Sequence, residues 1–302
     1  MNPARVLVTN MMMLKERDRF DKELRDRGYE PIWVDVEQFL TEERCLDLVV
    51  DIDGWLAGDD QITRAVLEKA LPRLKVIAKW GTGIDSIDLT SAKELGVPVL
   101  NAAGAFADAV AEVAIGLILM VTRHLGRIDR EVRTGGWPKP QGLELKSATL
   151  GMIGYGAIGR RIGELGVAFG MNVRFSDPFV DGSESVVEVA KAADVLCLAC
   201  ALTPENHHLV NADLLKSMKP GAIVANVARG PLVDTKALVD ALQSGHLGGA
   251  ALDVFEDEPL PAGHSLLGFD NVVVSSHNAN NGRGAVEAVH ARTLSNLDSA
   301  FK

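Results

Sequence analysis

Three glycines near the middle of the chain have a spacing that can hold a dinucleotide. The segment TLGMIGYGAIGRR, residues 149–161, has the pattern of an apolar strand, a tight turn and the start of a helix. Its G-x-G-x-x-G pattern is formed by Gly154, Gly156 and Gly159. The first glycine permits the turn, the second lets backbone N–H groups approach a pyrophosphate, and the third permits close packing of the helix on the strand. The amino end of that helix, near Ala157, would face the phosphates.

A carboxylate farther along the chain distinguishes NAD from NADP. A second apolar run, residues 171–177, ends in Asp177, close to the roughly 20-residue spacing expected beyond the glycine motif. A carboxylate in that place accepts hydrogen bonds from the adenosine ribose hydroxyls and would repel a 2′-phosphate. The next two residues are Pro178 and Phe179, where an NADP site usually has an arginine nearby. The sequence therefore predicts NAD as the cofactor.

The composition limits the size and the partners of the protein. A chain of 302 residues with 47% hydrophobic residues can bury a large core and form two domains. A net charge of −10 argues against binding to nucleic acids or anionic membranes. The longest apolar run, residues 113–121, is far shorter than the ~20 residues that cross a bilayer, and the N-terminus lacks the pattern of a signal peptide. We therefore expect a cytoplasmic protein with no nucleic-acid or membrane partner.

Apolar runs alternate with charged segments of helical spacing along the whole chain. In the first hundred residues these runs lie at 5–9, 31–36, 48–56, 74–80 and 97–100. After a long helical stretch, 108–124, a second series lies at 148–153, 172–176, 194–200, 222–227, 248–253 and 271–276. This alternation predicts an α/β protein with two doubly wound parallel-sheet domains. We expect one domain at 1–100 plus 281–302 and the other at 101–280, because the last helical segment is too short to form a domain alone.

Two pairs of metal-ligand residue types are better explained without a metal. Cys197 and Cys200 lie in an apolar run, where residues three apart point to opposite faces of a strand. His207 and His208 are adjacent, so in an extended segment we expect their side chains to point apart, and no acidic residue stands at ligand spacing. We therefore expect no metal site.

The chain resembles the D-isomer-specific 2-hydroxyacid dehydrogenases, which include D-lactate, glyoxylate/hydroxypyruvate and 3-phosphoglycerate dehydrogenases. Besides the glycine motif with Asp177, the resemblance is carried by GTGIDSIDL at 81–89, GVPVLNAAGAFADAVAE at 96–112, LTPENHHLV at 202–210, NVARGPLVD at 226–234, ALDVFEDEPL at 251–260 and NVVVSSH at 271–277. It implies a flavodoxin-like substrate domain, a Rossmann NAD-binding domain and a 2-oxoacid or 2-hydroxyacid substrate. It also implies a homodimer that pairs through the cofactor domain and the arm around Trp137.

The resemblance also places Arg229, Glu258 and His277 in the family's catalytic positions. Hydride transfer to or from C2 of a 2-hydroxy acid requires a proton to reach or leave the C2 oxygen, and histidine suits this role near neutral pH. Glu258 would fix the histidine tautomer and raise its pKa. Arg229 offers a planar fork that can hold the substrate carboxylate and polarise the keto oxygen.

Further site residues follow from the same resemblance. The substrate carboxylate would bind the loop formed by Gly81, Thr82 and Gly83, with Lys79 beside it as a candidate for a second anionic group of the substrate. The cofactor positions are Gly154, Gly156, Ala157, Ile158, Asp177, Thr203, Pro204, Ala228 and Asp253. Asp253 stands where the family holds the nicotinamide amide.

Departures from the family pattern leave the substrate's side chain open. Ser276 replaces a usual proline before His277, Ala103 stands where proline is common, and three asparagines follow the histidine, Asn278, Asn280 and Asn281. The loop LAGDDQ carries Asp59 and Asp60, which would repel a substrate phosphate there. Glu258 argues against a formate dehydrogenase, which lacks this partner. The alternative function is that of the family's corepressors, which sense NADH and recruit partners.

Overall fold

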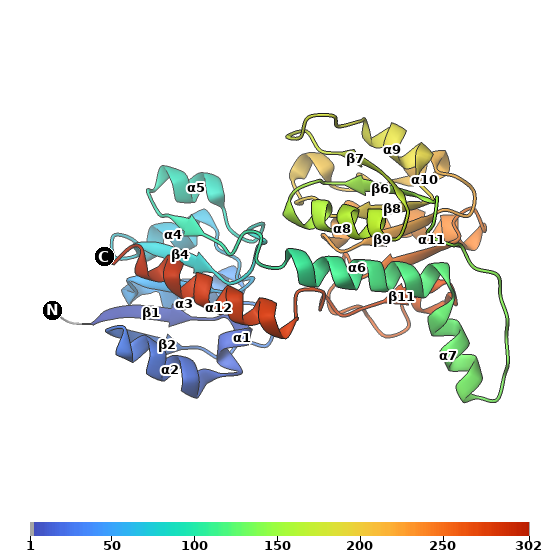
Figure 1. The fold of residues 1–302 in the computed structure, drawn as a ribbon. Helices are drawn as coiled ribbons and strands as arrows, with labels where there is room; N and C mark the ends of the chain where they lie inside the picture. Colours follow the sequence, from blue (N-terminus) through green and yellow to red (C-terminus); the bar gives the residue numbers. More distant parts are fainter. Residues whose placement is uncertain (1–2, 302) are drawn as a thin grey trace. The chain divides into compact units, whose positions relative to one another are not determined.

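The computed structural model describes residues 3–301 of the chain, which form two compact units (Figure 1). The first unit comprises Met1–Phe106 and Arg283–Lys302, and the second comprises Ala107–Gly282. Each unit has its own parallel sheet and its own core. Both sheets are covered by helices, which explains why their strands read as nearly continuous apolar runs.

The first unit contains a five-stranded parallel sheet in the order β2-β1-β3-β4-β5. Its strands are β1 (Ala4–Val8), β2 (Tyr29–Trp33), β3 (Gly54–Ala57), β4 (Val76–Lys79) and β5 (Val99–Leu100). Its helices are α1 (Met11–Leu14), α2 (Arg17–Asp26), α3 (Glu42–Leu48), α4 (Arg64–Ala70), α5 (Leu89–Glu94) and α12 (Arg283–Asp298). This strand order is flavodoxin-like. Successive strands are added on one side of β1 and then on the other, so the point where the strand order reverses lies between β1 and β3.

Helix α12, at the C-terminal end of the chain, packs on strands β3 and β4 of the first unit (Figure 1). Leu297 of α12 is fully buried there. Gly54 permits this approach, because a Cβ atom on that residue would lie 2.8 Å from a methyl group of Leu297.

The second unit contains a six-stranded parallel sheet in the order β11-β10-β9-β8-β6-β7. Its strands are β6 (Thr149–Ile153), β7 (Asn172–Ser176), β8 (Val195–Leu198), β9 (Ile223–Asn226), β10 (Gly249–Leu252) and β11 (Val272–Val274). Its helices are α6 (Ala107–Thr122), α7 (Leu125–Arg133), α8 (Ala157–Ala168), α9 (Val186–Ala192), α10 (Ala212–Ser217) and α11 (Thr235–Gln243). The predicted class, two doubly wound parallel-sheet α/β domains, is confirmed.

Two predicted elements differ from the structure. The apolar run 48–56 was expected to be one strand, but residues Val49–Asp51 form a 3₁₀ helix after α3 and only Gly54–Ala57 is extended. A short buried helix and a buried strand give the same apolar run, and the Thr41 side chain caps α3 in favour of the helix. The expected helix 108–124 ends at Thr122, because His124 adopts a left-handed conformation with φ 54° and α7 begins after it.

The helices differ from membrane-spanning helices in length or hydropathy. Over residues 3–301, none of the helices taken singly has the length and hydropathy needed to cross a bilayer. Helices α6 and α7 reach that threshold only as a pair, and they are bent by 64° relative to each other.

Candidate active site

The glycine motif forms the turn between β6 and α8, and its three glycines are needed for different reasons. Gly154 has φ 90°, and a Cβ there would lie 2.5 Å from the Cys200 nitrogen. At Gly159 a Cβ would lie 2.1 Å from the carbonyl oxygen of Gly154. A Cβ at Gly156 would meet no atom within 4 Å. The outer glycines therefore serve the protein's own packing, whereas the middle one leaves open space in front of the turn.

That open space lies at the amino end of α8. Gly156 is the N-cap of this helix and has no side chain, so no side chain caps it, and no acidic residue lies in the first turn. The first N–H groups of a twelve-residue helix and its dipole therefore remain available to an anion. The chain order reverses between β6 and β8, which places the turn where doubly wound sheets bind nucleotides. These residues fit a dinucleotide pyrophosphate.

Asp177 is fixed beside the glycine turn. It follows strand β7, the neighbour of β6 in the sheet. One carboxylate oxygen accepts a hydrogen bond from the Tyr155 backbone nitrogen at 2.7 Å, and the other accepts from the Phe179 nitrogen at 2.9 Å. The structure thus brings Asp177 to the turn and holds its carboxylate in one orientation.

The two cysteines of the C-x-x-C segment are buried or half-buried thiols. Cys197 and Cys200 are both free. Burial raises the pKa of the Cys197 thiol to about 12 and that of Cys200 to about 11, so both are protonated near neutral pH. Nowhere in residues 3–301 do three or more His, Cys, Asp or Glu side chains form a group that could hold a metal ion.

Arg229, Glu258 and His277 each follow one of three neighbouring strands of the second unit. These strands are β9, β10 and β11, which are adjacent and parallel, so their carboxyl ends meet at one edge of the sheet. The Nδ1 atom of His277 lies 2.7 Å from Oε2 of Glu258. The other carboxylate oxygen of Glu258 accepts a hydrogen bond from the Phe255 nitrogen at 2.9 Å. Glu258 is therefore held on both sides.

This contact shifts the pKa of both partners toward the charged pair. The hydrogen bond to Glu258 raises the pKa of His277 above its usual 6.5, against the opposing effect of burial. Burial favours the neutral form of Glu258, but the hydrogen bond and the charge of His277 lower the pKa of this carboxyl. The Arg229 charge acts on both groups, lowering the pKa of each. A half-buried imidazole that is protonated more readily than usual is suited to proton transfer.

The loop that carries Arg229 is shaped by Asn226, which the sequence analysis did not single out. The buried Asn226 side chain donates to the Arg229 carbonyl at 2.8 Å and accepts from the Ala228 nitrogen at 3.0 Å. The Arg229 guanidinium donates to the Ala228 carbonyl at 2.8 Å. A buried asparagine at the end of a strand was the available signal, since such a residue usually satisfies local backbone groups.

Asp253 holds the loop that carries His277. Its buried carboxylate accepts hydrogen bonds from the backbone nitrogens of Asn278 at 3.0 Å and Ala279 at 3.1 Å, and its carbonyl accepts from the His277 nitrogen at 2.8 Å. His277 itself has φ 54°, a left-handed conformation that is uncommon for a residue with a side chain. Asp253 thus stabilises the turn that presents the histidine.

The candidate substrate residues lie in the first unit: Lys79 is the last residue of β4, and Gly81, Thr82 and Gly83 lie in the loop after it. Lys79 is only 3% exposed, and its Nζ donates to Asp59 and to the Trp80 carbonyl, both at 2.9 Å. The loop is held by Asn101, whose side chain donates to the Thr82 carbonyl at 2.7 Å. Gly81 has φ 109°, which only glycine adopts easily. Lys79 is therefore engaged by the protein itself.

Asp60, one of the two acids of the LAGDDQ loop, points into the protein. Its carboxylate is fully buried and accepts hydrogen bonds from Thr9 and from the backbone nitrogens of Leu40 and Gly58, the latter two at 3.0 Å. Burial raises the pKa of this carboxyl, against the effect of these hydrogen bonds. The side chain of Asp60 thus shapes the loop, and the repulsion of a phosphate by Asp59 and Asp60 stays a prediction.

The expectation that the side chains of His207 and His208 point apart was wrong. The rings of His207 and His208 lie 4.0 Å apart, with 32° between their planes. His208 has φ 52°, which turns its ring away from the direction of an extended segment. Its Nε2 lies 2.6 Å from Oε1 of Glu256, an acidic partner that is remote in sequence.

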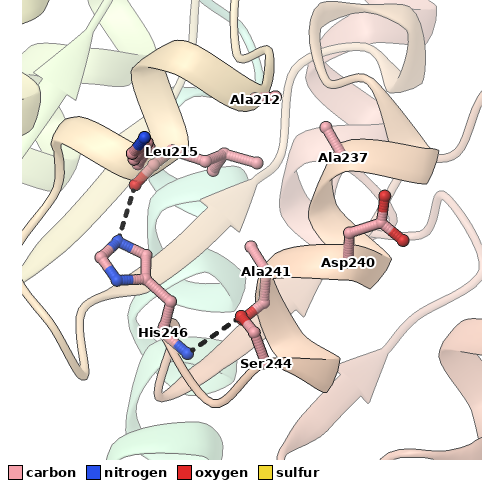
Figure 2. A pocket seen from close by; sticks show the side chains of 8 residues that line it. Ala212, Leu215, Ala237, Asp240, Ala241, Ser244 and His246 are labelled. Atoms are coloured by element: carbon pink, nitrogen blue, oxygen red, sulfur yellow. Dashed lines mark hydrogen bonds between the residues drawn. The ribbon is translucent and has the colours of Figure 1, made fainter.

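A cavity of about 250 Å³ in the second unit lies between α10 and α11. Arg229, Glu258 and His277 are not among its lining residues. Figure 2 shows a hydrogen bond between the His246 ring and the Leu215 carbonyl, and another from the His246 backbone nitrogen to the Ser244 hydroxyl. Four of the eight lining residues are aliphatic, and the histidine among the others is engaged by the backbone. The acid–base pair lies at the sheet edge instead.

The second unit is thus a Rossmann NAD-binding domain: a doubly wound parallel sheet, a glycine turn where the chain order reverses, and a fixed carboxylate beside it. Comparisons agree. The model of the "D-isomer specific 2-hydroxyacid dehydrogenase, NAD binding domain" matches residues 115–279. The chain belongs to the D-isomer specific 2-hydroxyacid dehydrogenase family and is an NAD-dependent oxidoreductase of that class.

Named relatives cover most of the chain. It is 40% identical over 270 residues to a glyoxylate reductase of Thermofilum pendens, covering 78% of this chain and 79% of that protein. It is 38% identical over 257 residues to a D-3-phosphoglycerate dehydrogenase of Methanocaldococcus jannaschii, covering 81% of this chain but only 49% of the relative. The solved structure of a D-lactate dehydrogenase of Aquifex aeolicus, in complex with NAD and lactic acid, is similar to this chain with a TM-score of 0.87. The identity is 28%, and the match covers 98% of this chain and 95% of that chain.

Proposed function

We propose that the protein interconverts a small 2-oxoacid and its D-2-hydroxy acid, with His277 as acid and base, Glu258 as its partner and Arg229 as the substrate clamp. The observation that carries this proposal is the 2.7 Å contact between His277 and Glu258, located in the unit that holds the glycine turn. When bound, NADH supplies the hydride. The protein must then deliver a proton and hold the substrate.

Glu258 determines which nitrogen of His277 reaches the substrate. A carboxylate only accepts hydrogen bonds, so His277 carries a proton on Nδ1, and Nε2 is left for the reaction. In reduction, Nε2 of the imidazolium gives its proton to the C2 oxygen, and in oxidation the neutral ring takes that proton back. The raised pKa keeps the imidazolium populated near neutral pH.

Arg229 supplies the positive charge that the substrate needs. Its planar guanidinium can bind a carboxylate with two parallel hydrogen bonds and can also polarise the keto oxygen. Its charge acts on Glu258 and His277, which supports a position beside the acid–base pair. On the family resemblance we assign a second anchor for the carboxylate to Gly81, Thr82 and Gly83, and the substrate domain to the first unit.

We assign the cofactor to residues of the second unit. Gly154, Gly156, Ala157 and Ile158 would hold the pyrophosphate, supported by the open space at Gly156. Asp177 would accept from the ribose hydroxyls, which favours NAD over NADP. On the family resemblance, the further cofactor positions are Thr203, Pro204 and Ala228, with Asp253 at the nicotinamide amide.

Lys79 bears on the substrate's side chain. Its ammonium group is buried and paired with Asp59, so a second anionic group on the substrate would have to compete with this carboxylate. We therefore favour a small substrate without a second charge, in line with the glyoxylate reductase relative.

We also propose a homodimer, which exposed apolar side chains of the second unit support. Leu125 and Val132 on α7 and Trp137 after it are all exposed, Trp137 by 78%. A set of apolar side chains on one segment of this kind is typical of a surface that another protein covers.

The test is the oxidation of NADH with a panel of oxoacids: glyoxylate, hydroxypyruvate, pyruvate, phosphohydroxypyruvate, and branched and aryl pyruvates. We expect glyoxylate or hydroxypyruvate to be reduced with the highest kcat/KM and phosphohydroxypyruvate poorly. Protein that binds NADH but reduces none of the panel would overturn the proposal and would favour a corepressor-like binding role.

A further inference from the structure

His208 and Glu256, both in the second unit, join the loop that carries Glu258 to the loop that carries Arg229. His208 lies in the segment after η2 (Pro204–Asn206), and Glu256 lies in the loop after β10, two residues before Glu258. Neither residue is among the proposed catalytic or cofactor positions. Their side chains meet at 2.6 Å, between Nε2 of His208 and Oε1 of Glu256.

Glu256 is held by donors on both of its oxygens. Oε1 faces His208, and Oε2 accepts from the Thr235 backbone nitrogen at 2.9 Å. Burial opposes the charged form, but the hydrogen bonds from Thr235 and His208 lower the pKa of this carboxyl. The carboxylate is therefore ionised and only accepts, so Nε2 of His208 must be the donor.

Phe255, the residue before Glu256, connects the position of Glu256 to that of Glu258. The Phe255–Glu256 peptide lies directly on Gly230, where a Cβ would be 1.8 Å from the Phe255 carbonyl carbon. The nitrogen of Phe255, on the other side of that residue, donates to Glu258 at 2.9 Å. A shift of Glu256 would thus move the donor that orients Glu258, and with it the partner of His277.

The backbone of His208 contacts the other loop. Its N–H donates to the carbonyl of Pro231 at 2.8 Å, just after Arg229 and Gly230. The positive φ of His208 permits this backbone contact while the ring reaches Glu256. A residue with a side chain adopts this conformation only where its surroundings hold it, and such residues occur often at functional sites.

We propose that His208 and Glu256 are a pair of positioning residues that fix the Glu258 loop against the Arg229 loop. His208 holds the first loop with its side chain and the second with its backbone. The pair does not touch the reacting atoms. Its expected effect on turnover rests on the proposed function, whereas its effect on the geometry of His277 does not.

The test compares three variants at adjacent positions. His208→Phe keeps a ring but removes the donor, His208→Gln restores a donor that can reach Glu256, and His207→Gln is the matched control on the exposed neighbour. For each, kcat and the KM for the oxoacid and for NADH are measured. The His277 ring is titrated by NMR, with its signal assigned from His277→Asn, and the melting temperature confirms folding.

We expect His208→Phe to lower kcat by about ten- to a hundredfold, with the KM for NADH unchanged, because small displacements of a catalytic group have effects of this size. The pKa of His277 should fall toward its usual 6.5 as Glu258 loosens. His208→Gln should recover most of both properties, and His207→Gln should match the wild type.

Glu256→Ala reaches the same contact without changing the left-handed residue, and it replaces His208→Phe if that variant does not fold. The double variant His208→Phe/Glu256→Ala should be no worse than either single one, because both remove the same contact. An unchanged pKa of His277 in folded His208→Phe and Glu256→Ala would overturn the positioning claim. If no oxoacid is reduced but the pKa of His277 moves, the positioning claim stands and the proposed function fails.

Discussion

Two histidines, one in each unit, show how the partner of an imidazole determines its role. His277 in the second unit is partly exposed and faces the Glu258 carboxylate at 2.7 Å, which raises its pKa. His290 in α12 of the first unit is buried, and its Nδ1 accepts a hydrogen bond from the Trp80 ring nitrogen at 3.1 Å. Because an indole N–H only donates, the Nδ1 atom of His290 must be unprotonated.

The pKa of His290 is accordingly lowered. Burial is the main cause, and the Glu16 carboxylate, whose nearest oxygen lies 3.9 Å from Nε2, offsets only part of it. His290 therefore remains neutral and packs against Phe20 and Trp80, while His277 can exchange its proton. His277 thus has the carboxylate partner and the access to solvent that its proposed acid–base role requires, whereas His290 is buried and its nearest carboxylate lies beyond hydrogen-bond distance.

The largest expected effect is that of His277→Asn. This variant loses the group that transfers the proton, so turnover should fall by about 10³-fold, within the range for removal of a general acid or base. NADH binding, measured by fluorescence titration, should remain. A turnover of His277→Asn near the wild-type rate would show that His277 does not differ from His290 in having an acid–base role.

Glu258→Gln should have the next largest effect. The variant replaces one of the two carboxylate oxygens by an NH2 group, which donates and cannot accept. In the present side-chain position, either the contact with Phe255 or that with His277 is therefore lost. We expect kcat to fall about a hundredfold, because the ring loses its preferred tautomer. Steady-state kinetics measure this, and an unchanged kcat would show that Glu258 does not act through the histidine.

Arg229→Lys separates charge from geometry. Lysine keeps the positive charge that acts on His277 but loses the planar fork, so the pKa of the histidine should change little. The KM for the oxoacid should rise roughly tenfold, which corresponds to one lost charge-assisted hydrogen bond. A rise in the KM for NADH alone would place Arg229 at the cofactor instead.

The smallest effect on turnover is expected for His290→Gln, which instead tests stability. Because the pKa of His290 is lowered in the folded protein, the unfolded chain binds more protons below 6.5, and the wild type loses stability as the pH falls through that value. In the variant this loss should be smaller, by roughly 2 °C in the melting temperature. An identical pH dependence of the melting temperature would show that His290 is not buried as a neutral ring.

The sequence predicted most of the fold because buried parallel strands appear as apolar runs. Every predicted run overlaps a strand, but Val49–Asp51 was assigned to one wrongly, since apolar periodicity over so few residues does not separate a strand from a helix. The glycine turn and Asp177 could be predicted together because their spacing along the chain reflects a single βαβ unit.

The site was predictable where it depends on strand ends and not where it depends on side-chain direction. The sequence gives the charge of Asp60 but not its direction: the side chain lies inside, where its carboxylate accepts from the backbone nitrogens of Leu40 and Gly58. The contact of His208 with Glu256 joins residues far apart in the chain and requires a left-handed backbone at His208. No local pattern in the sequence carries that information.

The central claim is that His277 transfers the proton at the C2 oxygen, and the pH dependence of kcat/KM in both directions tests it most directly. Reduction needs the imidazolium, so its kcat/KM should fall as the pH rises through a midpoint above 6.5, while oxidation should rise through the same midpoint. If both directions showed the same pH dependence, or if the midpoint persisted in the residual activity of His277→Asn, another group would be the acid and base.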